Sequence, residues 1–186
     1  MTDPFATGVL QKDVHDRLVA GLDGYARDAG IPKPWIWTPL ADTCGPEEIS
    51  WVRRFPHHAG EGVQGLIYTH ISGQGDPETR MAAIAGALVR NFVRARVMTL
   101  GTVLDMLAER EAPVATCLLI PNFCMAPDEG GGVSKWQVGP LYDLLVARGL
   151  EGKQTVLYAS SLNDAAKLYG SAMGRLLSTK YVNVKI

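Results

Sequence analysis

The sequence has few cysteines and no long apolar run, and each shortage excludes a class of protein. Only three of its 186 residues are cysteines (Cys44, Cys117 and Cys124), and none stands in a C-x-x-C spacing, so neither a disulfide framework nor a zinc site of that type is expected. The longest stretch without a charge, 112–127, is shorter than the roughly 18 residues of a membrane-spanning helix and is interrupted by proline. No basic segment followed by an apolar one marks a secretory signal. We therefore expect a cytoplasmic protein without a membrane partner.

An excess of charge of either sign is also missing. Eighteen Lys and Arg residues oppose nineteen Asp and Glu, for a net charge of −1. No overall field favours nucleic acid or a membrane surface, so any such contact requires a local patch. Twenty glycines and eleven prolines stay below the share typical of low-complexity chains, and 47% hydrophobic residues suffice for one folded core.

From residue 61 onward, short apolar runs alternate with helical stretches. The predicted strands cover 65–71, 96–100, 116–123, 155–160 and 181–186, and the predicted helices between them cover 77–92, 102–110, 135–148 and 164–177. Apolar strands joined by helical crossovers predict an α/β fold with a three-layer parallel sheet over 61–186. Residues 1–60 are expected to form an N-terminal part that leads into this core, with helices at 13–29 and 46–54. Between those helices, 32–39 is too rich in proline for a regular helix and is expected to be a linker anchored by tryptophan.

A glycine-containing loop, 72–79, follows the first predicted strand and opens a helix, which is where a phosphate-binding loop would lie. Such a loop needs a glycine and a lysine directly before its Ser or Thr, but here those places hold Pro77 and Glu78. Proline removes a backbone N–H, and a carboxylate about 4 Å from a phosphate charge costs about 4 kcal/mol at an effective dielectric constant of ~20. The same residues suit an ordinary helix start with Asp76 as N-cap and Pro77 in the first turn. Ordinary ATP binding is therefore disfavoured.

From Ile31 onward, the order of signals resembles the AAA+ domain of DnaC-type helicase loaders and IstB-type transposase helper proteins. Ile31-Pro32 is similar to the family's entry Ile-Pro, and GLIY to its first strand. SGQGDPET falls on the family's GPPGTGKT loop, and RVMTLGTVLDMLAERE is similar to its second strand and the helix that follows. SKWQ, LYDLL with Arg148, ASSL and GRLL with Arg175 are similar to the family's later segments. The resemblance implies a P-loop NTPase core of AAA+ type, without a sizeable C-terminal lid domain.

By this resemblance, the positions that handle nucleotide carry unsuitable side chains. The phosphate loop is vestigial at Gly73, Gly75, Glu78 and Thr79; the acidic Walker B strand has Pro121 and Asn122, and the sensor asparagine is Ser161. Without the lysine and the carboxylates that support Mg²⁺, the γ-phosphate charge has no counter-ion. We therefore expect a pseudo-ATPase with no catalytic residue, no metal and no cofactor. Arg175 keeps the place of the arginine that acts on a neighbouring subunit's nucleotide, which makes it an arginine-finger candidate.

The implied function belongs to DNA replication or mobile-element biology, as a helicase-loader-like adaptor or as the regulatory subunit of an active ATPase. The expected partners are a replicative helicase, an initiator or an active AAA+ homologue, in a homo- or hetero-oligomer, with DNA as a further partner. Two alternatives stay open. One is an active loader or transposition helper that binds ATP and Mg²⁺ through an altered loop, using Gly75 and Thr79. The other is an antagonist that inserts into a ring of active ATPases.

A basic cluster, Arg90, Arg94 and Arg96, ends the predicted helix 77–92. Spacing of four places Arg90 and Arg94 on one helix face, which suits contact with a nucleic-acid backbone. A solvated helix C-terminus is the alternative interpretation.

Other residues of interest favour structural roles. His57 and His58 have no further ligand at metal spacing, so we expect an exposed pair without metal. Trp35 and Trp37 lie among prolines, where they either anchor a partner or pack the linker onto the domain.

Overall fold

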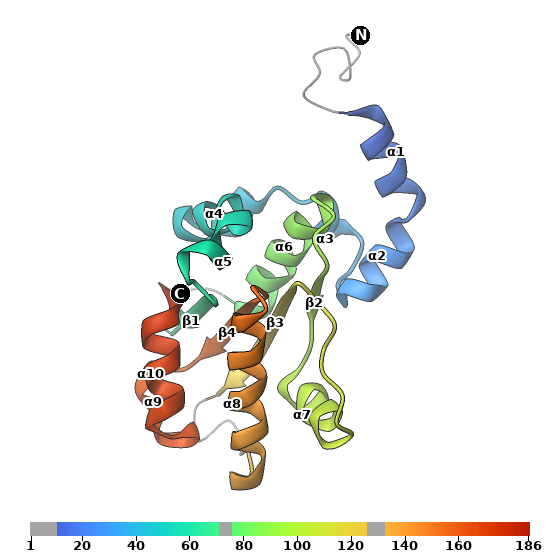
Figure 1. The fold of residues 1–186 in the computed structure, drawn as a ribbon. Helices are drawn as coiled ribbons and strands as arrows, with labels where there is room; N and C mark the ends of the chain where they lie inside the picture. The colour runs from blue at the N-terminus through green and yellow to red at the C-terminus, as the bar shows by residue number, and fades with distance from the viewer. Residues whose placement is uncertain (1–10, 71–75, 126–132) are drawn as a thin grey trace.

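The computed structural model describes residues 11–70, 76–125 and 133–186 and contains a five-stranded parallel sheet with helices on both faces (Figure 1). The strands are β1 (Gly65–Thr69), β2 (Ala95–Val97), β3 (Cys117–Cys124), β4 (Gln154–Ala159) and β5 (Tyr181–Lys185). Their order across the sheet is β2-β3-β4-β1-β5, and every neighbouring pair is parallel. The predicted α/β class and three-layer parallel sheet are confirmed.

One face of the sheet is covered by α6 (Pro77–Arg90), with α2 (Leu22–Ala29), α3 (Pro34–Trp37) and α4 (Pro46–Arg53) outside it. Because successive side chains of a strand point to opposite faces, Leu66 and Tyr68 of β1 join this core while Ile67 joins the other. Helix α3 lies close against α6: a Cβ atom at Gly86 would come within 2.1 Å of the Trp35 carbonyl oxygen. Only glycine allows this approach.

The opposite face is covered by α7 (Leu100–Ala108), α8 (Lys135–Leu150), α9 (Leu162–Tyr169) and α10 (Ser171–Lys180). Their apolar side chains pack on Ile67, Leu118 and Leu157 of the three central strands. The rings of Phe123 and Tyr169 lie 4.9 Å apart between their centroids, and the Tyr169 hydroxyl donates to the Phe123 carbonyl. The end of β3 is thereby fixed to α9.

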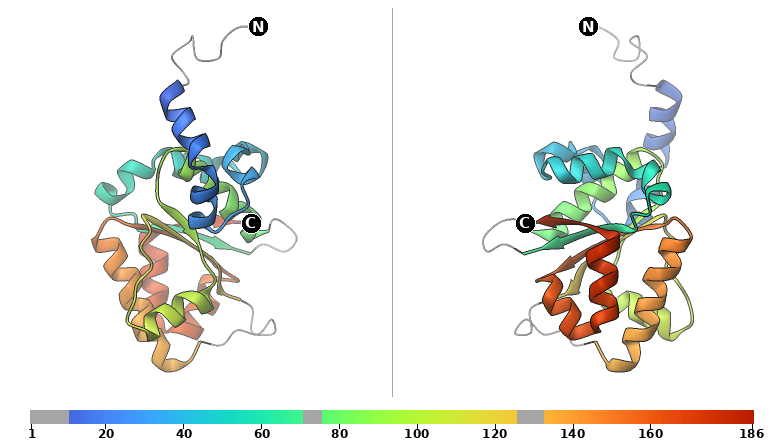
Figure 2. Two further views of the ribbon diagram at one scale, coloured as in Figure 1. Left: turned by 90° about the vertical axis from the view of Figure 1, so that its right-hand side faces the viewer. Right: turned by 60° about the vertical axis from the view of Figure 1, so that its left-hand side comes forward.

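Three predicted segments differ in detail from the structure. The predicted helix 13–29 is two helices, α1 (Lys12–Ala20) and α2, which separate at Gly21, and α1 extends away from the body (Figure 2). The predicted helix 164–177 is also two helices, because Gly170 adopts φ 90°, a conformation open to glycine. The linker prediction was wrong in excluding a helix: α3 is one helical turn, and Pro34 occupies its first position, where no N–H is needed.

Short helical turns flank α4 before the chain enters β1: a 3-10 helix (Leu40–Asp42) precedes α4, and a second 3-10 helix (Phe55–His57) and α5 (His58–Glu61) follow it. His57 is exposed as expected, but the same expectation was wrong for His58, which is 3% exposed. Its ring stacks on Trp51 with centroids 5.1 Å apart, and its Nε2 lies 2.8 Å from the Trp51 carbonyl oxygen. The second histidine therefore helps to hold α5 on α4.

None of the helices in the described parts of the chain is both long and apolar enough to cross a membrane.

Candidate functional site

The start of α6 occupies the phosphate-loop position, and its free backbone N–H groups are already bound. The Asp76 carboxylate accepts from the N–H groups of Glu78 and Thr79, both at 3.1 Å, and from the Thr79 hydroxyl at 2.5 Å. Pro77 has no N–H to offer. The groups that bind phosphate at other helix starts are therefore engaged by a carboxylate of this chain. Gly73 and Gly75 lie outside the described residues.

These hydrogen bonds favour the ionised form of Asp76. The bond from the Thr79 hydroxyl, followed by the two backbone N–H groups, lowers the pKa of the Asp76 carboxyl. The folded pKa lies below the unfolded one, so this contribution to stability is fully present above the unfolded pKa of about 4. It is lost as the pH falls from there through the lowered folded value.

Replacing Asp76 with Ala is expected to lower the free energy of unfolding by about 1 kcal/mol, because the first turn of α6 loses its N-cap. Asp76→Asn keeps a side-chain acceptor and should stay within a few tenths of a kcal/mol of the parent protein. Urea denaturation at pH 7 measures both variants. Equal stability of the Asp76→Ala variant and the parent would show that the cap contributes nothing.

A cavity of about 400 Å³ brings several of the predicted positions together. Glu78, Thr79 and Pro121 line it, along with Asp76 and Trp35. None of the described residues that line this cavity is basic. Two carboxylates in a lining whose described residues include no basic side chain make this a poor environment for a phosphate group.

At the end of β3, Pro121 and Asn122 stand where the resembled family has acidic residues, and both have structural roles. Pro121 lies past the last residue of β2 in the sheet, and the pairing with β4 is irregular between Ile120 and Cys124, so a missing N–H is tolerated in a central strand. The Asn122 side-chain oxygen accepts from the Leu100 N–H at 2.8 Å, at the start of α7. Asn122 therefore joins β3 to the neighbouring helix.

Ser161 caps a helix. Its hydroxyl accepts from the Asp164 N–H at 3.0 Å and donates to the Asp164 carboxylate at 2.6 Å, at the start of α9. Hydrogen bonding by Ser161 is the main cause that lowers the pKa of Asp164. Both groups are satisfied locally, as in an ordinary N-cap.

The arginine candidates lie at separate places. Arg175 is exposed on α10 and forms no ion pair within the described residues. Helix α6 ends at Arg90, so the interpretation that Arg90 and Arg94 share a helix face was wrong. Arg90 is half-buried, and burial lowers the pKa of its guanidinium, whereas Arg94, just before β2, and Arg96, within β2, are exposed.

Metal ligation and thiol chemistry find no support in the described residues. They contain no group of three or more His, Cys, Asp or Glu side chains that could hold a metal ion. The three cysteines are buried, and burial raises the pKa of Cys44 and Cys117 to about 12 and that of Cys124 to about 11. Protonated thiols of this kind are poor nucleophiles.

A buried ion pair beside the site was missed by the sequence interpretation. Glu48 of α4 accepts from Arg80 of α6 at 2.5 Å, from the Tyr68 hydroxyl at 3.2 Å and from the Gly45 N–H at 2.7 Å. The side chains of Glu48 and Arg80 are 2% and 21% exposed. The sequence Gly-Pro-Glu-Glu at 45–48 places a glutamate three residues after a helix N-cap, where its side chain can accept from the N-cap N–H, and this was the available signal for Glu48.

Comparison with known proteins gives matches among solved structures alone: no family model and no curated protein matches the sequence. The chain is similar to DnaI, with 14% identity, a TM-score of 0.55, and 84% of this chain and 91% of that chain covered. It is similar to a DNA replication initiation factor at 10% identity (TM-score 0.56, 79% and 48% covered). It is also similar to AMPPCP-bound DnaA from Aquifex aeolicus at 11% identity (TM-score 0.51, 79% and 49% covered).

The chain spans about half the length of the initiation-factor and DnaA chains. At identities this low, the likeness shows the fold: an α/β P-loop fold of AAA+ type, as the resemblance implied.

Proposed function

We propose that this chain is a non-hydrolysing protein with an AAA+-type core that acts in DNA replication or mobile-element biology. It would serve as a helicase-loader-like adaptor or as the regulatory subunit of an active ATPase. The field of action is supported by the likeness to DnaI and to DnaA, the latter also in a structure with AMPPCP and single-stranded DNA. Its partners would be a replicative helicase, an initiator or an active AAA+ homologue, with DNA as a further partner.

The main support for the proposed loss of hydrolysis is that the Asp76 carboxylate accepts hydrogen bonds from the backbone N–H groups at the start of α6. To bind here, a phosphate would have to displace the Asp76 carboxylate from these N–H groups and lie close to the Glu78 carboxylate. Repulsion between the negative charges of the phosphate and of the two carboxylates opposes this binding. Mg²⁺ would find the Thr79 hydroxyl bound to Asp76, and Pro121 and Asn122 in place of carboxylates.

Binding of ATP and ADP in the presence of Mg²⁺, measured by isothermal titration calorimetry, tests this proposal. We expect no binding at millimolar nucleotide, because the Asp76 and Glu78 carboxylates repel phosphate. For the same reason, nucleotide should not raise the Tm of the chain in a thermal-shift assay. Micromolar binding to the parent chain that is lost in Thr79→Ala would overturn it and favour the alternative, an active loader with an altered loop. Arg175→Ala is the matched control, since it lies on α10 and leaves the start of α6 unchanged.

Arg175 is then proposed to act in trans, on the nucleotide of an active partner subunit. Its support is an exposed guanidinium without an ion pair within the described residues. An arginine supplied by a neighbour stabilises the charge of the transition state for phosphoryl transfer. A subunit that lacks hydrolysis can still supply this group.

A further inference from the structure

A groove of about 470 Å³ lies between α2, the C-terminal end of α6 and β2. Its volume falls within the roughly 300–1,000 Å³ of ordinary binding clefts. Among the described residues, β2 is an edge strand of the sheet, paired with β3. We call this feature the arginine groove because Arg27, Arg94 and Arg96 line it.

The arginine groove carries unpaired positive charge. Arg27, Arg94 and Arg96 are exposed, and none forms an ion pair with a carboxylate of the described residues. Asp28 is the one acidic residue among the described groove residues. Elsewhere on the surface, exposed Lys12 and other cations do have carboxylate partners. The groove therefore offers guanidinium groups that match carboxylates or phosphates.

Apolar side chains lie beside these charges. Val114, at the rim, is 66% exposed, and Tyr25, Phe92 and Val93 are half-buried. An exposed apolar side chain next to free arginines suits a ligand that carries both apolar and negatively charged groups.

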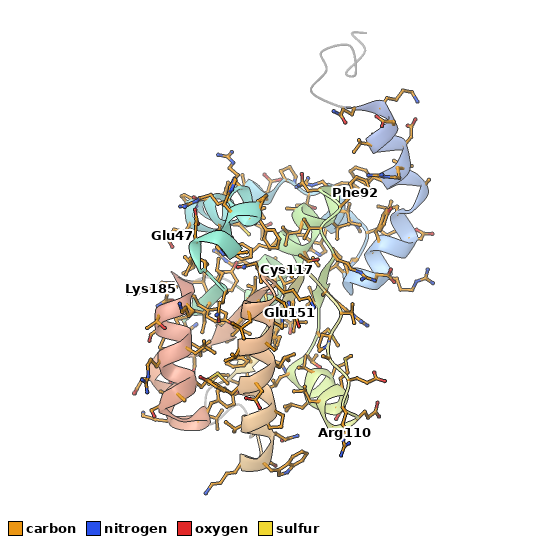
Figure 3. All side chains as sticks on the ribbon, in the orientation of Figure 1. Glu47, Phe92, Arg110, Cys117, Glu151 and Lys185 are labelled. Carbon is orange, nitrogen blue, oxygen red and sulfur yellow. The ribbon has the colours of Figure 1, made fainter. Side chains whose placement is uncertain are left out.

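The state of Phe92 favours a peptide over nucleic acid. Single-stranded nucleic acids bind by stacking bases on open aromatic rings. The Phe92 ring is already covered by the Arg17 guanidinium, 4.0 Å from its centroid, and meets Tyr25 edge-on at 5.9 Å. Its backbone has a left-handed φ of 56°, which is strained for an aromatic residue and is held by this packing. Figure 3 shows Phe92 at the side of the body from which α1 and α2 rise.

We propose that the arginine groove binds an extended acidic segment of a partner protein, with its carboxylates on Arg27, Arg94 and Arg96 and an apolar side chain on Val114. An extended segment suits the groove because its three arginines come from separate places, Arg27 from α2, Arg94 from the residues before β2 and Arg96 from β2, so carboxylates spaced along a peptide can reach them. The Asp28 carboxylate, which would repel a phosphate backbone, can be avoided by a peptide whose charges are spaced along it. This binding goes beyond the proposed function and does not depend on whether nucleotide binds, so the calorimetric experiment and this one fail separately.

Selection from a random library of 12-residue peptides on phage tests the proposal. The full chain is the target, and the Arg94→Glu/Arg96→Glu variant is used for counter-selection. The enriched peptides should carry Asp or Glu on both sides of an apolar residue. The best of them, labelled with fluorescein, should bind at least tenfold more weakly to the variant by fluorescence anisotropy. Its affinity should also fall with added salt, because the charged groups are exposed.

Lys135→Glu/Lys180→Glu is the matched control, since it makes the same change in net charge at exposed residues of α8 and α10 and should bind the peptide like the parent. Circular dichroism checks that each variant is folded; if the arginine double variant is not, Arg27→Glu on α2 provides the same comparison. Three results would overturn the proposal. They are peptides without acidic residues, equal affinity for parent and variant, and displacement of the peptide from the groove by tighter binding of a dT20 oligonucleotide.

Discussion

Replacing Glu48 with Ala is expected to lower the free energy of unfolding by about 3 kcal/mol. Removal of one partner from a buried ion pair typically costs about 3–5 kcal/mol, because the other charge stays in the interior without compensation. Here Arg80 keeps 21% of its side chain exposed and can recover part of its hydration, which places the expected loss at the lower end.

Three groups lose their acceptor in this variant. The Gly45 N–H and the Tyr68 hydroxyl would be left unpaired, along with the Arg80 guanidinium. Tyr68 is fully buried, and burial followed by the charge of Glu48 raises the pKa of its hydroxyl. A buried hydroxyl without a partner costs about 1–3 kcal/mol, so the expected loss does not depend on the ion pair alone.

Urea denaturation at pH 7 measures this loss, and Glu47→Ala is the control. Glu47 precedes Glu48 on α4 but is exposed, so its replacement should change stability by less than about 0.5 kcal/mol. Because α4 contacts α6 through this pair, hydrogen exchange in the Glu48→Ala variant should be faster than in the parent, and the increase should be larger in α4 than in β3. Equal losses in the two variants would contradict a special role for the buried carboxylate.

The sheet could be predicted from the sequence because several of its strands are near-continuous apolar runs. Strand β1 is buried at every residue, and β3 is buried at all but one, which gives the near-continuous apolar runs that distinguish buried parallel strands. Strand β2 was predicted over 96–100, but it ends at Val97, since Thr99 is the N-cap of α7 and its side chain accepts from the Thr102 N–H at 3.2 Å. Local capping decided that boundary.

The helix breaks were harder to predict, because apolar periodicity continues across them. Leu18, Leu22 and Tyr25 follow one helical stripe, although Gly21 separates α1 from α2. Gly21 leaves the helical conformation with φ −98° and ψ 5°, which the apolar pattern does not reveal. The end of α6 was also hard to predict, because Phe92 follows it in a left-handed conformation that glycine or asparagine usually adopts after a helix.

The candidate site was predicted where its chemistry is local. Asp76 as the N-cap of α6 follows from the sequence, because Asp-Pro-Glu at a helix start has one favoured arrangement. The cavity that joins Glu78 to Pro121 depends on the order of the strands, which no local pattern contains. The Glu48–Arg80 pair connects residues 32 apart, and the arginine groove joins α2 to β2, so both needed the tertiary structure.

Replacing Arg148 with Met is expected to lower the free energy of unfolding by about 3 kcal/mol. Arg148 is 3% exposed at the end of α8, and burial lowers the pKa of its guanidinium. It donates to the carbonyl oxygens of Ala115 and Gln154 at 3.1 and 2.7 Å and to the Thr155 hydroxyl at 3.0 Å. Each acceptor left unpaired lowers the free energy of unfolding by about 1–3 kcal/mol. Part of this loss is offset, because the variant no longer buries a charged group.

The sign of this prediction depends on the nature of the acceptors. A buried ion pair can be replaced by apolar residues without loss because both charges are removed together. The acceptors of Arg148 are mostly backbone carbonyls at the starts of β3 and β4, and no side-chain substitution removes them. Arg148→Lys should also lose stability, because one ammonium group cannot reach acceptors that the guanidinium meets with three nitrogens.

Arg53→Met, at an exposed position of α4, is the control and should stay within about 0.5 kcal/mol of the parent in urea denaturation. A loss below about 1 kcal/mol for Arg148→Met would show that β3 and β4 do not depend on this arginine.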